Sequence, residues 1–481
     1  MKLKQLIRNL HLTVKGSQEI DISSLSNDSR KTAPGGLFIA KKGERLNGSN
    51  FIQEAILAGA AAIVSDLYDP FVFKTQIIHP NPAALEPILA ARFYENPSKD
   101  LFVCAATGTK GKTTTTYFIK QLLDALGVSS GLIGTIETIA GGRRFFSSLT
   151  THDAIFNQKW LREMQIERCR AACLEVSSHG LAQDRISGID LDAAVFTNLS
   201  PDHLDYHGTI EAYAQAKKQL FFQLESSSKK NKRALFNADS SWTPFMQKDL
   251  QTPFWTFGRN CLADIRASEC VFSPDQLQCK IHFQEKSILF TAPLMGSFNL
   301  HNLLAAVGIA LHAGFSLKDI KDAAAMLKLP PGRLEKVGSQ VFVDYAHTGD
   351  SLDLALGMLK ALRPRELWVV FGCGGDRDPN RRLEMAKAAE AHADRIIITT
   401  DNPRSEQPEE IARQILSGFS AIEKVQVELD RREAILRSIR EMKEGDLLLI
   451  AGKGHEKTQV FAYQTVPFDD VLVAKEGLVR D

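Results

Sequence analysis

The stretch that decides the fold is Val103-Cys104-Ala105-Ala106-Thr107-Gly108-Thr109-Lys110-Gly111-Lys112-Thr113-Thr114. A short apolar run ends in a glycine-bearing loop, and Lys-Thr-Thr opens a helix. In such loops the backbone N–H groups face phosphates, and the helix N-terminus adds partial positive charge. The lysine reaches the outer phosphates, and the hydroxyl after it meets Mg²⁺. The stretch therefore predicts a nucleoside triphosphate site, against the alternative of a simple Gly/Thr-rich turn. Ala106 stands where a standard P-loop has its first glycine.

Bulk composition indicates a large globular chain. Its 481 residues suggest about three domains, and 44% are hydrophobic and 24% charged. The net charge of +1 gives no general electrostatic reason to expect nucleic acid or an anionic membrane as partner. Neither an apolar span of ~20 residues nor a signal peptide is recognisable. We interpret the seven scattered cysteines as reduced packing residues of a cytoplasmic protein.

Apolar runs and breaker residues predict an α/β protein of three domains, at 1–87, 88–330 and 331–481. The first mixes apolar runs at 36–40, 61–65 and 75–79 with polar loops, and ends near the two prolines of 79–83. Strands are expected at 101–106, 131–136, 171–176, 193–197 and 233–237, and later at 340–344, 366–371, 395–400, 424–428 and 446–450. Helices are expected between them, as at 381–392 and 407–418. Such alternation predicts parallel sheets, which bind ligands at the carboxyl ends of their strands.

Chemically active residues follow two of the central strands. Glu175 comes at a strand end, where a carboxylate suits Mg²⁺, although a capping or surface role is equally compatible. Asp202, His203, Asp205 and His207 form a dense polar cluster, for which a hydrogen-bonded turn is the alternative. On the next helix Lys217 shares a stripe with Tyr213 and Phe221. Spacing alone favours a snorkelling lysine there.

Strand ends of the last region carry groups suited to an amino acid. Asp344 and His347 follow one strand, and Arg377, Arg404 and Glu456 follow three others. Guanidiniums bind carboxylates bidentately, and a glutamate suits an ammonium. The alternative is a set of separate surface salt bridges. A dinucleotide-binding interpretation of Gly372–Arg377 is weak, because its glycines do not follow GxGxxG.

Six ordered motifs together resemble the Mur ligases, and among them the members that add the third residue of the peptide. They are Thr107–Thr114, Glu175–His179, Asp202–Asp205, Tyr213 to Phe221, Asp344–His347 and Gly452–Glu456, and the resemblance spans nearly the whole chain. It implies an N-terminal UDP-substrate domain, a central P-loop-type ATPase domain with a mostly parallel sheet, and a Rossmann-like C-terminal domain. It also implies amide formation through an acyl phosphate, with ATP as co-substrate and Mg²⁺ as cofactor.

The resemblance assigns roles residue by residue. Catalytic positions are Lys112, Glu175, His203 and Lys217, where Lys217 matches the family's carbamylated lysine, formed with CO₂. Metal positions are Thr113, Glu175, His203 and the Lys217 carbamate. ATP positions are Gly108, Thr109, Lys110, Gly111, Lys112, Thr113, Thr114, Asn299, Asn302, Arg333, Asp344 and His347. Positions for the UDP-muramoyl dipeptide, UDP-MurNAc-L-Ala-D-Glu, are Asn27, Ser29, Glu44, Arg45, Leu46, Thr150, Thr151, Ser177, Gln183 and Arg185.

The incoming amino acid is expected to be meso-diaminopimelate. The signature Asp401-Asn402-Pro403-Arg404 resembles the version that selects it over L-lysine, and Arg377, Gly452 and Glu456 complete that pocket. Diaminopimelate has a second carboxylate that Arg404 can bind, and an unpaired, buried arginine would disfavour lysine. The resemblance further implies a cytoplasmic, monomeric enzyme without nucleic-acid or membrane partners.

The sequence departs from the family pattern beside three motifs. His152 and Gly349 stand where proline is expected, and Lys110 stands where many members carry asparagine. Rival readings are a related ligase that uses lysine, a folate-polyglutamating ligase, and a nucleotide-switch or transport ATPase. Arg404 argues against the first and Asp28-Ser29-Arg30 against the second. The third would need neither Lys217 nor the Arg377, Arg404 and Glu456 group.

Overall fold

The computed structural model describes residues 1–43, 46–273 and 275–479. It divides the chain into two compact units. One comprises Met1–Val271, Gln278–Ala292 and Ser297–Leu327, and the other Phe272–Leu277, Pro293–Gly296 and Lys328–Asp481. The predicted substrate residues Glu44 and Arg45 lie outside the described residues.

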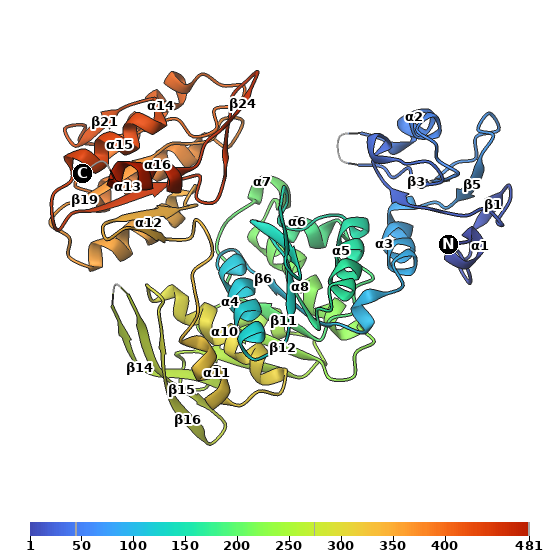
Figure 1. The fold of residues 1–481 in the computed structure, drawn as a ribbon, viewed down its shortest axis with the longest axis horizontal. Helices are drawn as coiled ribbons and strands as arrows, with labels where there is room; N and C mark the ends of the chain where they lie inside the picture. Colours follow the sequence, from blue (N-terminus) through green and yellow to red (C-terminus); the bar gives the residue numbers. More distant parts are fainter. Residues whose placement is uncertain (44–45, 274, 480–481) are drawn as a thin grey trace. The chain divides into compact units, whose positions relative to one another are not determined.

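The first unit begins with a five-stranded sheet in the order β1-β5-β4-β3-β2 (Figure 1). The pairing is parallel except between β1 and β5. The elements are α1 (Leu3–Leu6), β1 (Thr13–Lys15), β2 (Leu25–Ser26), β3 (Leu37–Ile39), α2 (Ile52–Leu57), β4 (Ala62–Ser65), β5 (Thr75–Ile78) and α3 (Pro82–Phe93). The three apolar runs of this region contain the strands β3, β4 and β5.

The proline pair near residue 80 starts a helix instead of breaking structure. Pro82 is the first residue of α3, and the Asn81 side chain accepts a hydrogen bond from the Ala84 N–H. Proline suits this position because its missing N–H would have no helical partner there. The expectation that both prolines discourage regular structure was therefore wrong at Pro82.

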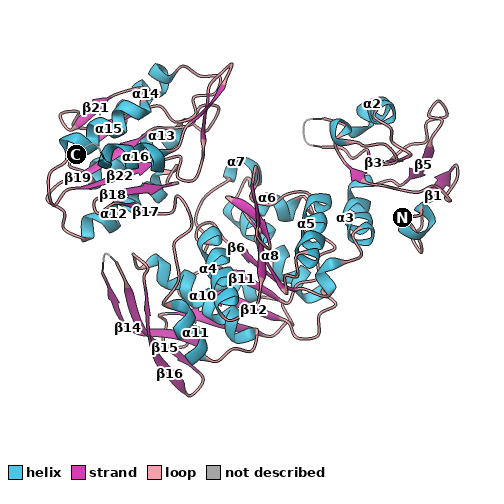
Figure 2. Cartoon of the chain, in the orientation of Figure 1, coloured by secondary structure: helices cyan, strands magenta, loops and turns pink. Residues whose placement is uncertain are grey.

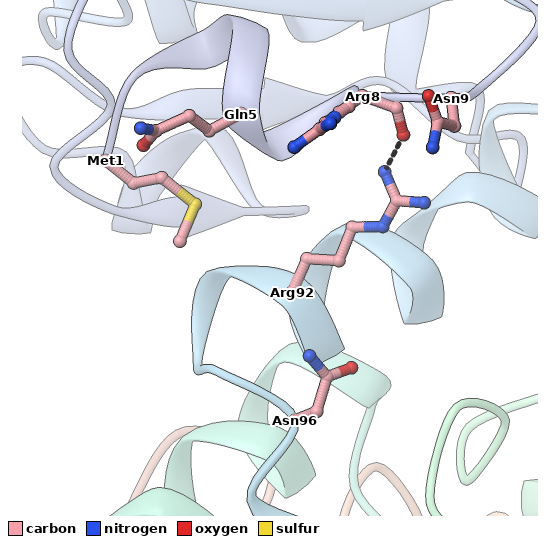
Figure 3. A pocket seen from close by; sticks show the side chains of 6 residues that line it. All are labelled: Met1, Gln5, Arg8, Asn9, Arg92 and Asn96. Atoms are coloured by element: carbon pink, nitrogen blue, oxygen red, sulfur yellow. Dashed lines mark hydrogen bonds between the residues drawn. The ribbon is translucent and has the colours of Figure 1, made fainter.

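A surface cavity of about 370 Å³ opens beside α1 and α3 (Figure 3). Its lining consists of Met1, Gln5, Arg8, Asn9, Arg92 and Asn96. The Arg92 guanidinium donates to the carbonyls of Leu6 (3.0 Å) and Arg8 (2.7 Å) and so fastens α1 to α3. None of the lining residues is a predicted site residue.

An eleven-stranded sheet forms the centre of the first unit, in the order β16-β15-β14-β13-β12-β11-β6-β10-β7-β8-β9. Its middle strands pair in parallel, whereas β8 pairs antiparallel with β7 and β9. The strands are β6 (Phe102–Thr107), β7 (Ser130–Ile133), β8 (Glu137–Ala140), β9 (Arg143–Phe146), β10 (Ala171–Glu175), β11 (Ala193–Phe196), β12 (Arg233–Asn237), β13 (Phe254–Gly258), β14 (Ile265–Phe272), β15 (Leu277–Phe283) and β16 (Lys286–Ala292). The five predicted central strands are present, but sequence reasoning missed β8, β9 and β13 to β16.

Helices flank this sheet (Figure 2). They are α4 (Lys112–Ala125), α5 (Ala154–Ile166), α6 (Ser178–Ala182), α7 (Leu204–His207), α8 (Ile210–Ser226), α9 (Thr243–Gln247), α10 (Phe298–His312) and α11 (Leu317–Ala324). Helix α4 buries Phe118, Ile119, Leu122 and Leu123 and ends before Gly127, whose φ is 80°. Its apolar spacing and glycine stop thus act as predicted. The phosphate loop follows the end of β6, and α4 begins directly after the loop.

The second unit holds a six-stranded sheet in the order β17-β18-β22-β19-β20-β21, parallel except between β17 and β18. Its strands are β17 (Glu335–Val337), β18 (Val341–Asp344), β19 (Leu367–Phe371), β20 (Arg395–Ile398), β21 (Val425–Val427) and β22 (Leu447–Ala451), with the hairpin β23 (Thr458–Val460) and β24 (Thr465–Pro467). The helices are α12 (Gly349–Ala361), α13 (Asn380–His392), α14 (Pro408–Leu416), α15 (Arg431–Glu441) and α16 (Asp470–Val479). The five strands expected here are confirmed.

Within the described ranges, no helix is both long and apolar enough to cross a membrane.

Candidate active site

The phosphate loop requires glycine at two positions. Gly108 and Gly111 have φ values of 152° and 85°, and a Cβ on Gly108 would lie 1.9 Å from Thr197 Oγ1. The Lys112 ammonium donates to the carbonyls of Gly108 (2.9 Å) and Thr109 (3.0 Å). The lysine therefore lies over the loop, and Thr113 and Thr114 begin α4 behind it.

The end of β11 forms one wall of this loop. Thr197 Oγ1 donates to the Lys110 carbonyl at 2.7 Å, and the Lys110 N–H donates to Asn198 Oδ1 at 2.9 Å. Lys110 is thus held through its backbone. These hydrogen bonds do not depend on which side chain stands at this position. Sequence reasoning did not include Thr197 and Asn198 in the site, although they follow a strand just before the Asp/His cluster.

Lys217 is enclosed beneath the phosphate loop. Its side chain is 1% exposed, Nζ donates to the Gly108 carbonyl at 2.8 Å, and Nζ lies 4.3 Å from the centre of the Tyr213 ring. Burial lowers the pKa of Lys217 well below its usual value, and the charge of Lys112 lowers it further, while Asp202 opposes this. A snorkelling lysine would reach water, so that alternative is wrong. The amine is buried and favoured in its neutral form.

Glu175 ends β10, which pairs with β6 so that Glu175 lies opposite Ala106. Its Oε2 accepts hydrogen bonds from the backbone N–H and the hydroxyl of Thr135. The other oxygen, Oε1, is buried and has no hydrogen-bond partner among the described residues. A buried carboxylate oxygen without a donor suits a cation. Thr135, which orients this carboxylate, was not found from the sequence.

His203 has an imidazole that is neutral near pH 7. It caps α7 with a φ of 54°, and its Nε2 lies 3.6 Å from Asp202 Oδ2. Burial lowers the pKa of His203 to about 4, although Asp202 opposes the shift. The rings of His179 and Tyr213 lie 4.9 and 6.2 Å away, centre to centre. A neutral imidazole can donate a lone pair to a metal ion.

The fit of a magnesium ion rests on these two groups. The unpartnered Glu175 oxygen and the neutral His203 imidazole both suit a cation. Over the described part of the chain, however, no set of three or more His, Cys, Asp or Glu side chains is arranged to hold a metal. Among the described residues, Glu175 and His203 therefore do not form a complete metal site with a third side chain of these types.

A hydrogen-bonded group connects Glu175 to predicted substrate residues. Thr151 Oγ1 donates to the Glu175 carbonyl at 3.0 Å and accepts from the Ser177 N–H at 2.9 Å. Thr135 Oγ1 and Thr150 Oγ1 are 3.0 Å apart, and the Thr150 hydroxyl is the donor because the Thr135 hydroxyl donates to Glu175; Arg185 donates to the Thr151 carbonyl at 2.7 Å. Gln183 Oε1 in turn accepts two hydrogen bonds from Arg185. The structure thus brings together Thr150, Thr151, Ser177, Gln183 and Arg185.

The other described residues that were predicted to bind the substrate, Asn27, Ser29 and Leu46, belong to the N-terminal region. Asn27 donates to Glu86 Oε1 at 3.1 Å, and Ser29 donates to Glu54 Oε2 at 2.9 Å. Leu46 is 65% exposed. Both polar side chains are therefore held by carboxylates of α3 and α2.

Asn299 and Asn302 lie buried at the start of α10, a helix that packs on α4. Asn302 donates to Asn299 Oδ1 at 3.1 Å and accepts from Thr115 Oγ1 at 3.2 Å. A Cβ at Gly111 would lie 2.5 Å from Asn302 Oδ1, which places this amide against the phosphate loop.

In the second unit, three strand-end loops meet. The Gly375 N–H donates to the Asn402 carbonyl at 2.9 Å, and the Arg404 guanidinium donates to the Gly375 carbonyl at 2.6 Å. Arg404 has a φ of 52°, an uncommon value for a residue other than glycine. A Cβ at Gly452 would lie 2.5 Å from Asp401 Oδ2. Without a ligand, Arg404 is half-buried and its guanidinium has a carbonyl partner.

Lys453 occupies the middle of these loops with a fully buried side chain. Its Nζ donates to Asn402 Oδ1 (2.9 Å) and Glu456 Oε2 (3.1 Å) and lies 3.8 Å from Asp401 Oδ1. Asn402 also donates to Glu456 Oε2 at 2.7 Å. The predicted pocket residues Asp401, Asn402 and Glu456 thus share one cation that sequence reasoning did not include.

A second buried cation, Arg431, fixes the backbone of the same loops. It forms a bidentate ion pair with Asp470, and both side chains are 0% exposed. It also donates to the carbonyls of Ala451 (2.9 Å) and Thr400 (3.5 Å), which directly precede the two loops. No local sequence signal marked it, because its partners come from distant segments.

Tyr345 lies within the influence of several charged groups, which include the remaining predicted residues Arg333 and Arg377. Burial raises its pKa, the charges of Glu456 and Asp401 raise it further, and Arg333 and Arg377 oppose this. The Arg333 guanidinium lies 4.8 Å from the Tyr345 ring centre, and Asp344 accepts from the Leu334 N–H at 2.6 Å. Burial raises the pKa of Asp344. His347 and Arg377 are exposed side chains at this edge.

His152 and Gly349, the two residues that stand where the family pattern has proline, both fit their surroundings. His152 stacks on Phe156, with ring centres 3.8 Å apart, and its Nε2 is 2.7 Å from Ser147 Oγ. Gly349 is the first residue of α12, behind the Thr348 cap, and a Cβ there would lie 2.6 Å from Glu384 Cβ. Helix α13 approaches too closely for a side chain at 349.

The fold and these strand-end sites define a nucleotide-dependent ligase of several domains. The family models match along the chain, as Mur ligase family, catalytic domain (residues 21–91), Mur ligase middle domain (106–310) and Mur ligase, glutamate ligase domain (332–454). The chain belongs to the Mur ligase family, and its three-domain α/β architecture is that of the family.

Named relatives are similar over the full length. The chain is 40% identical to UDP-N-acetylmuramoyl-L-alanyl-D-glutamate--2,6-diaminopimelate ligases of Chlamydia caviae and Geobacillus kaustophilus, covering 99% of each chain in both comparisons. A solved structure of a ligase with that name is 32% identical, covers 100% of this chain and 99% of its own, and superposes with a TM-score of 0.71.

Proposed function

We propose that this protein is the ligase that joins meso-2,6-diaminopimelate to the D-glutamate side-chain carboxylate of UDP-N-acetylmuramoyl-L-alanyl-D-glutamate, in peptidoglycan precursor synthesis. ATP supplies the driving force through an acyl phosphate. The full-length similarity to ligases of that name supports the substrates. The observation that carries the chemistry is the phosphate loop, which lies beside an unpartnered carboxylate oxygen of Glu175 and over the buried amine of Lys217.

The reaction comprises two substitutions. A glutamate carboxylate oxygen attacks the γ-phosphorus of ATP, the bond to the bridging oxygen breaks, and ADP leaves. The amine nitrogen of diaminopimelate then attacks the acyl carbon, phosphate leaves, and the nitrogen loses a proton to form the amide. Loop N–H groups, the α4 N-terminus and Lys112 stabilise the anionic phosphates in the first step. Thr150, Thr151, Ser177, Gln183 and Arg185 hold the dipeptide end, and Asn27, Ser29, Glu44, Arg45 and Leu46 hold the UDP end.

Glu175, His203 and Thr113 would hold Mg²⁺, which screens the charge of the phosphates when bound. We also assign Lys217 as a carbamate. A buried amine with a lowered pKa is a nucleophile at neutral pH, so its nitrogen bonds to the carbon of CO₂ and a proton is released. The product is an anion beneath the phosphate loop, where a metal ion needs oxygen ligands.

The second unit presents the amino acid. Arg404 and Arg377 bind carboxylates of diaminopimelate, and Asp401, Asn402 and Glu456 bind an ammonium beside Gly452 and Pro403. Asn299, Asn302, Arg333, Asp344 and His347 contact ATP. We assign the three domains to residues 1–87, 88–330 and 331–481. Three successive family matches, at 21–91, 106–310 and 332–454, support this division.

The setting is the cytoplasm, with the protein as a monomer that needs neither nucleic acid nor membrane. Seven free cysteines agree with a reducing compartment. Light scattering of the purified chain measures its mass, and a dimer would contradict the monomer.

The proposed function is tested by measuring ADP and the amide product in the same reaction. ADP should form only when the UDP-dipeptide and diaminopimelate are both present, and mass spectrometry should find the amide product. Rapid ATP hydrolysis without either substrate would instead favour a switch or transport ATPase.

A further inference from the structure

Lys453 is a buried cation with a specific set of partners. Asn402 Oδ1 accepts from Lys453 (2.9 Å) and from the Val460 N–H (3.0 Å), while Asn402 Nδ2 donates to Glu456 Oε2 (2.7 Å). Oε2 also accepts from Lys453 at 3.1 Å. Both donors therefore bind the same oxygen of Glu456, and this fixes the rotation of its carboxylate.

The rotation leaves the other oxygen, Oε1, for a ligand. No hydrogen bond joins Oε1 to another of the described residues, and the Glu456 side chain is 31% exposed. Asp401 and Glu456 carry two negative charges around the one positive charge of Lys453. One unit of negative charge remains, which an ammonium group would neutralise.

Lys453 differs in its task from the neighbouring Arg431. Arg431 binds the carbonyls of Thr400 and Ala451 and so holds the loop backbones. Lys453 binds only side chains of the pocket, so it sets where their polar atoms point. Its removal would leave two buried acceptors short of a donor and two carboxylates without their shared cation.

We propose that Lys453 is a positioning residue that fixes Glu456, directly and through Asn402, as the acceptor for an ammonium group of the incoming amino acid. The inference rests on the proposed function, because it assumes that this pocket receives diaminopimelate. It concerns the binding of one substrate only, so ATP and the UDP-dipeptide should be unaffected.

Steady-state kinetics of the full chain test this role, with each substrate varied in turn. Lys453→Met should raise KM for diaminopimelate roughly 10- to 100-fold. KM for ATP and for the UDP-dipeptide should stay within about twofold. Lys453→Arg, which keeps the charge, should give a diaminopimelate KM between those of wild type and Lys453→Met. The control Lys457→Met alters an exposed lysine of the same loop, paired with Asp469, and should leave every KM unchanged.

Far-UV circular dichroism shows whether Lys453→Met folds. If it does not, Lys453→Arg carries the test, and at least about a threefold rise confined to the diaminopimelate KM is expected, because a planar fork cannot reproduce the two hydrogen bonds together with the ion pair to Asp401. An unchanged diaminopimelate KM in a folded variant, or equal rises for all substrates, would overturn the positioning role alone. Wild-type protein without diaminopimelate-dependent ADP formation would instead overturn the proposed function.

Discussion

Two lysines that are equally buried have opposite surroundings in the two sites. Lys217, 1% exposed, meets a carbonyl and an aromatic ring and forms no ion pair with a described residue, and its pKa falls well below the usual value. Lys453, 0% exposed, lies against Glu456 and close to Asp401. Burial alone therefore does not decide what a lysine does. An uncompensated amine becomes reactive, whereas a compensated one organises its partners.

The two sites differ in the same way as a whole. The phosphate loop is built from backbone groups and glycines, and leaves Oε1 of Glu175 without a donor. The pocket of the second unit is built from side-chain hydrogen bonds and ion pairs around Lys453, which leave Oε1 of Glu456 for a ligand. Substitutions should therefore damage the first site through geometry and the second through charge.

The largest effect is expected at Lys217. Lys217→Ala removes the proposed carbamate and should lower kcat on the order of a hundredfold or more. A small carboxylate such as formate should restore part of the activity, because it supplies the missing anion. Steady-state kinetics with and without formate measure both effects.

Lys218→Ala is the matched control, since Lys218 is the next buried residue of α8 and its Nζ lies 3.8 Å from Asp249 instead of the loop. Full activity in Lys217→Ala would refute the assignment. So would the absence of a carbamate signal when wild type is incubated with isotope-labelled bicarbonate.

The next largest effect concerns the backbone geometry of the phosphate loop. Gly108→Ala would place Cβ 1.9 Å from Thr197 Oγ1 at a φ of 152°, so the loop must shift. The Kd for ATP should rise about 10- to 100-fold by calorimetric titration. Gly142→Ala, which meets open space, should leave it unchanged. Wild-type affinity in Gly108→Ala would show that the loop does not bind phosphate.

A smaller, selective effect is expected at Arg404. Arg404→Ala removes a guanidinium that would pair with the distal carboxylate, so kcat/KM for diaminopimelate should fall about tenfold more than kcat/KM for L-lysine. Competition assays with both amino acids measure the ratio. Arg413→Ala, which breaks only an exposed ion pair with Glu410, is the control. Equal losses for the two amino acids would contradict selection by Arg404.

The smallest effect concerns His455 in the second unit, whose ring should not titrate in the usual pH range of histidine. Burial lowers the pKa of His455 to about 3, and the positive charges of Arg333, Lys457, His347 and Lys453 add to this. The neutral ring therefore contributes stability above the ordinary pKa of about 6.5, and this is lost as pH falls toward 3. Histidine NMR resonances, assigned with His455→Asn, should show no titration of His455 from about pH 8 to about pH 5. A midpoint near the ordinary value would show that water reaches the ring.

Much of the fold was predictable because it depends on local patterns. Apolar runs predicted ten strands of the two later regions, and Thr107–Thr114 predicted the phosphate loop. Strands β8, β9 and β13 to β16 were missed, since they lie outside the strand–helix alternation on which the prediction relied. Spacing alone favoured a snorkelling side chain for Lys217, because spacing cannot show what covers a helix face; only the family resemblance assigned it a catalytic role.

The sequence by itself determined the family and the order of the motifs, and it predicted which residues meet phosphate, metal and amino acid. Tertiary structure alone decided the state of those groups. Lys217 reaches a carbonyl 109 positions away, Glu175 is oriented by Thr135, 40 positions away, and Lys453 joins Asn402, 51 positions away. Such pairs form because parallel strands bring distant chain segments to one edge of a sheet. The resulting burial and charge, which set pKa and orientation, cannot be read from neighbours in sequence.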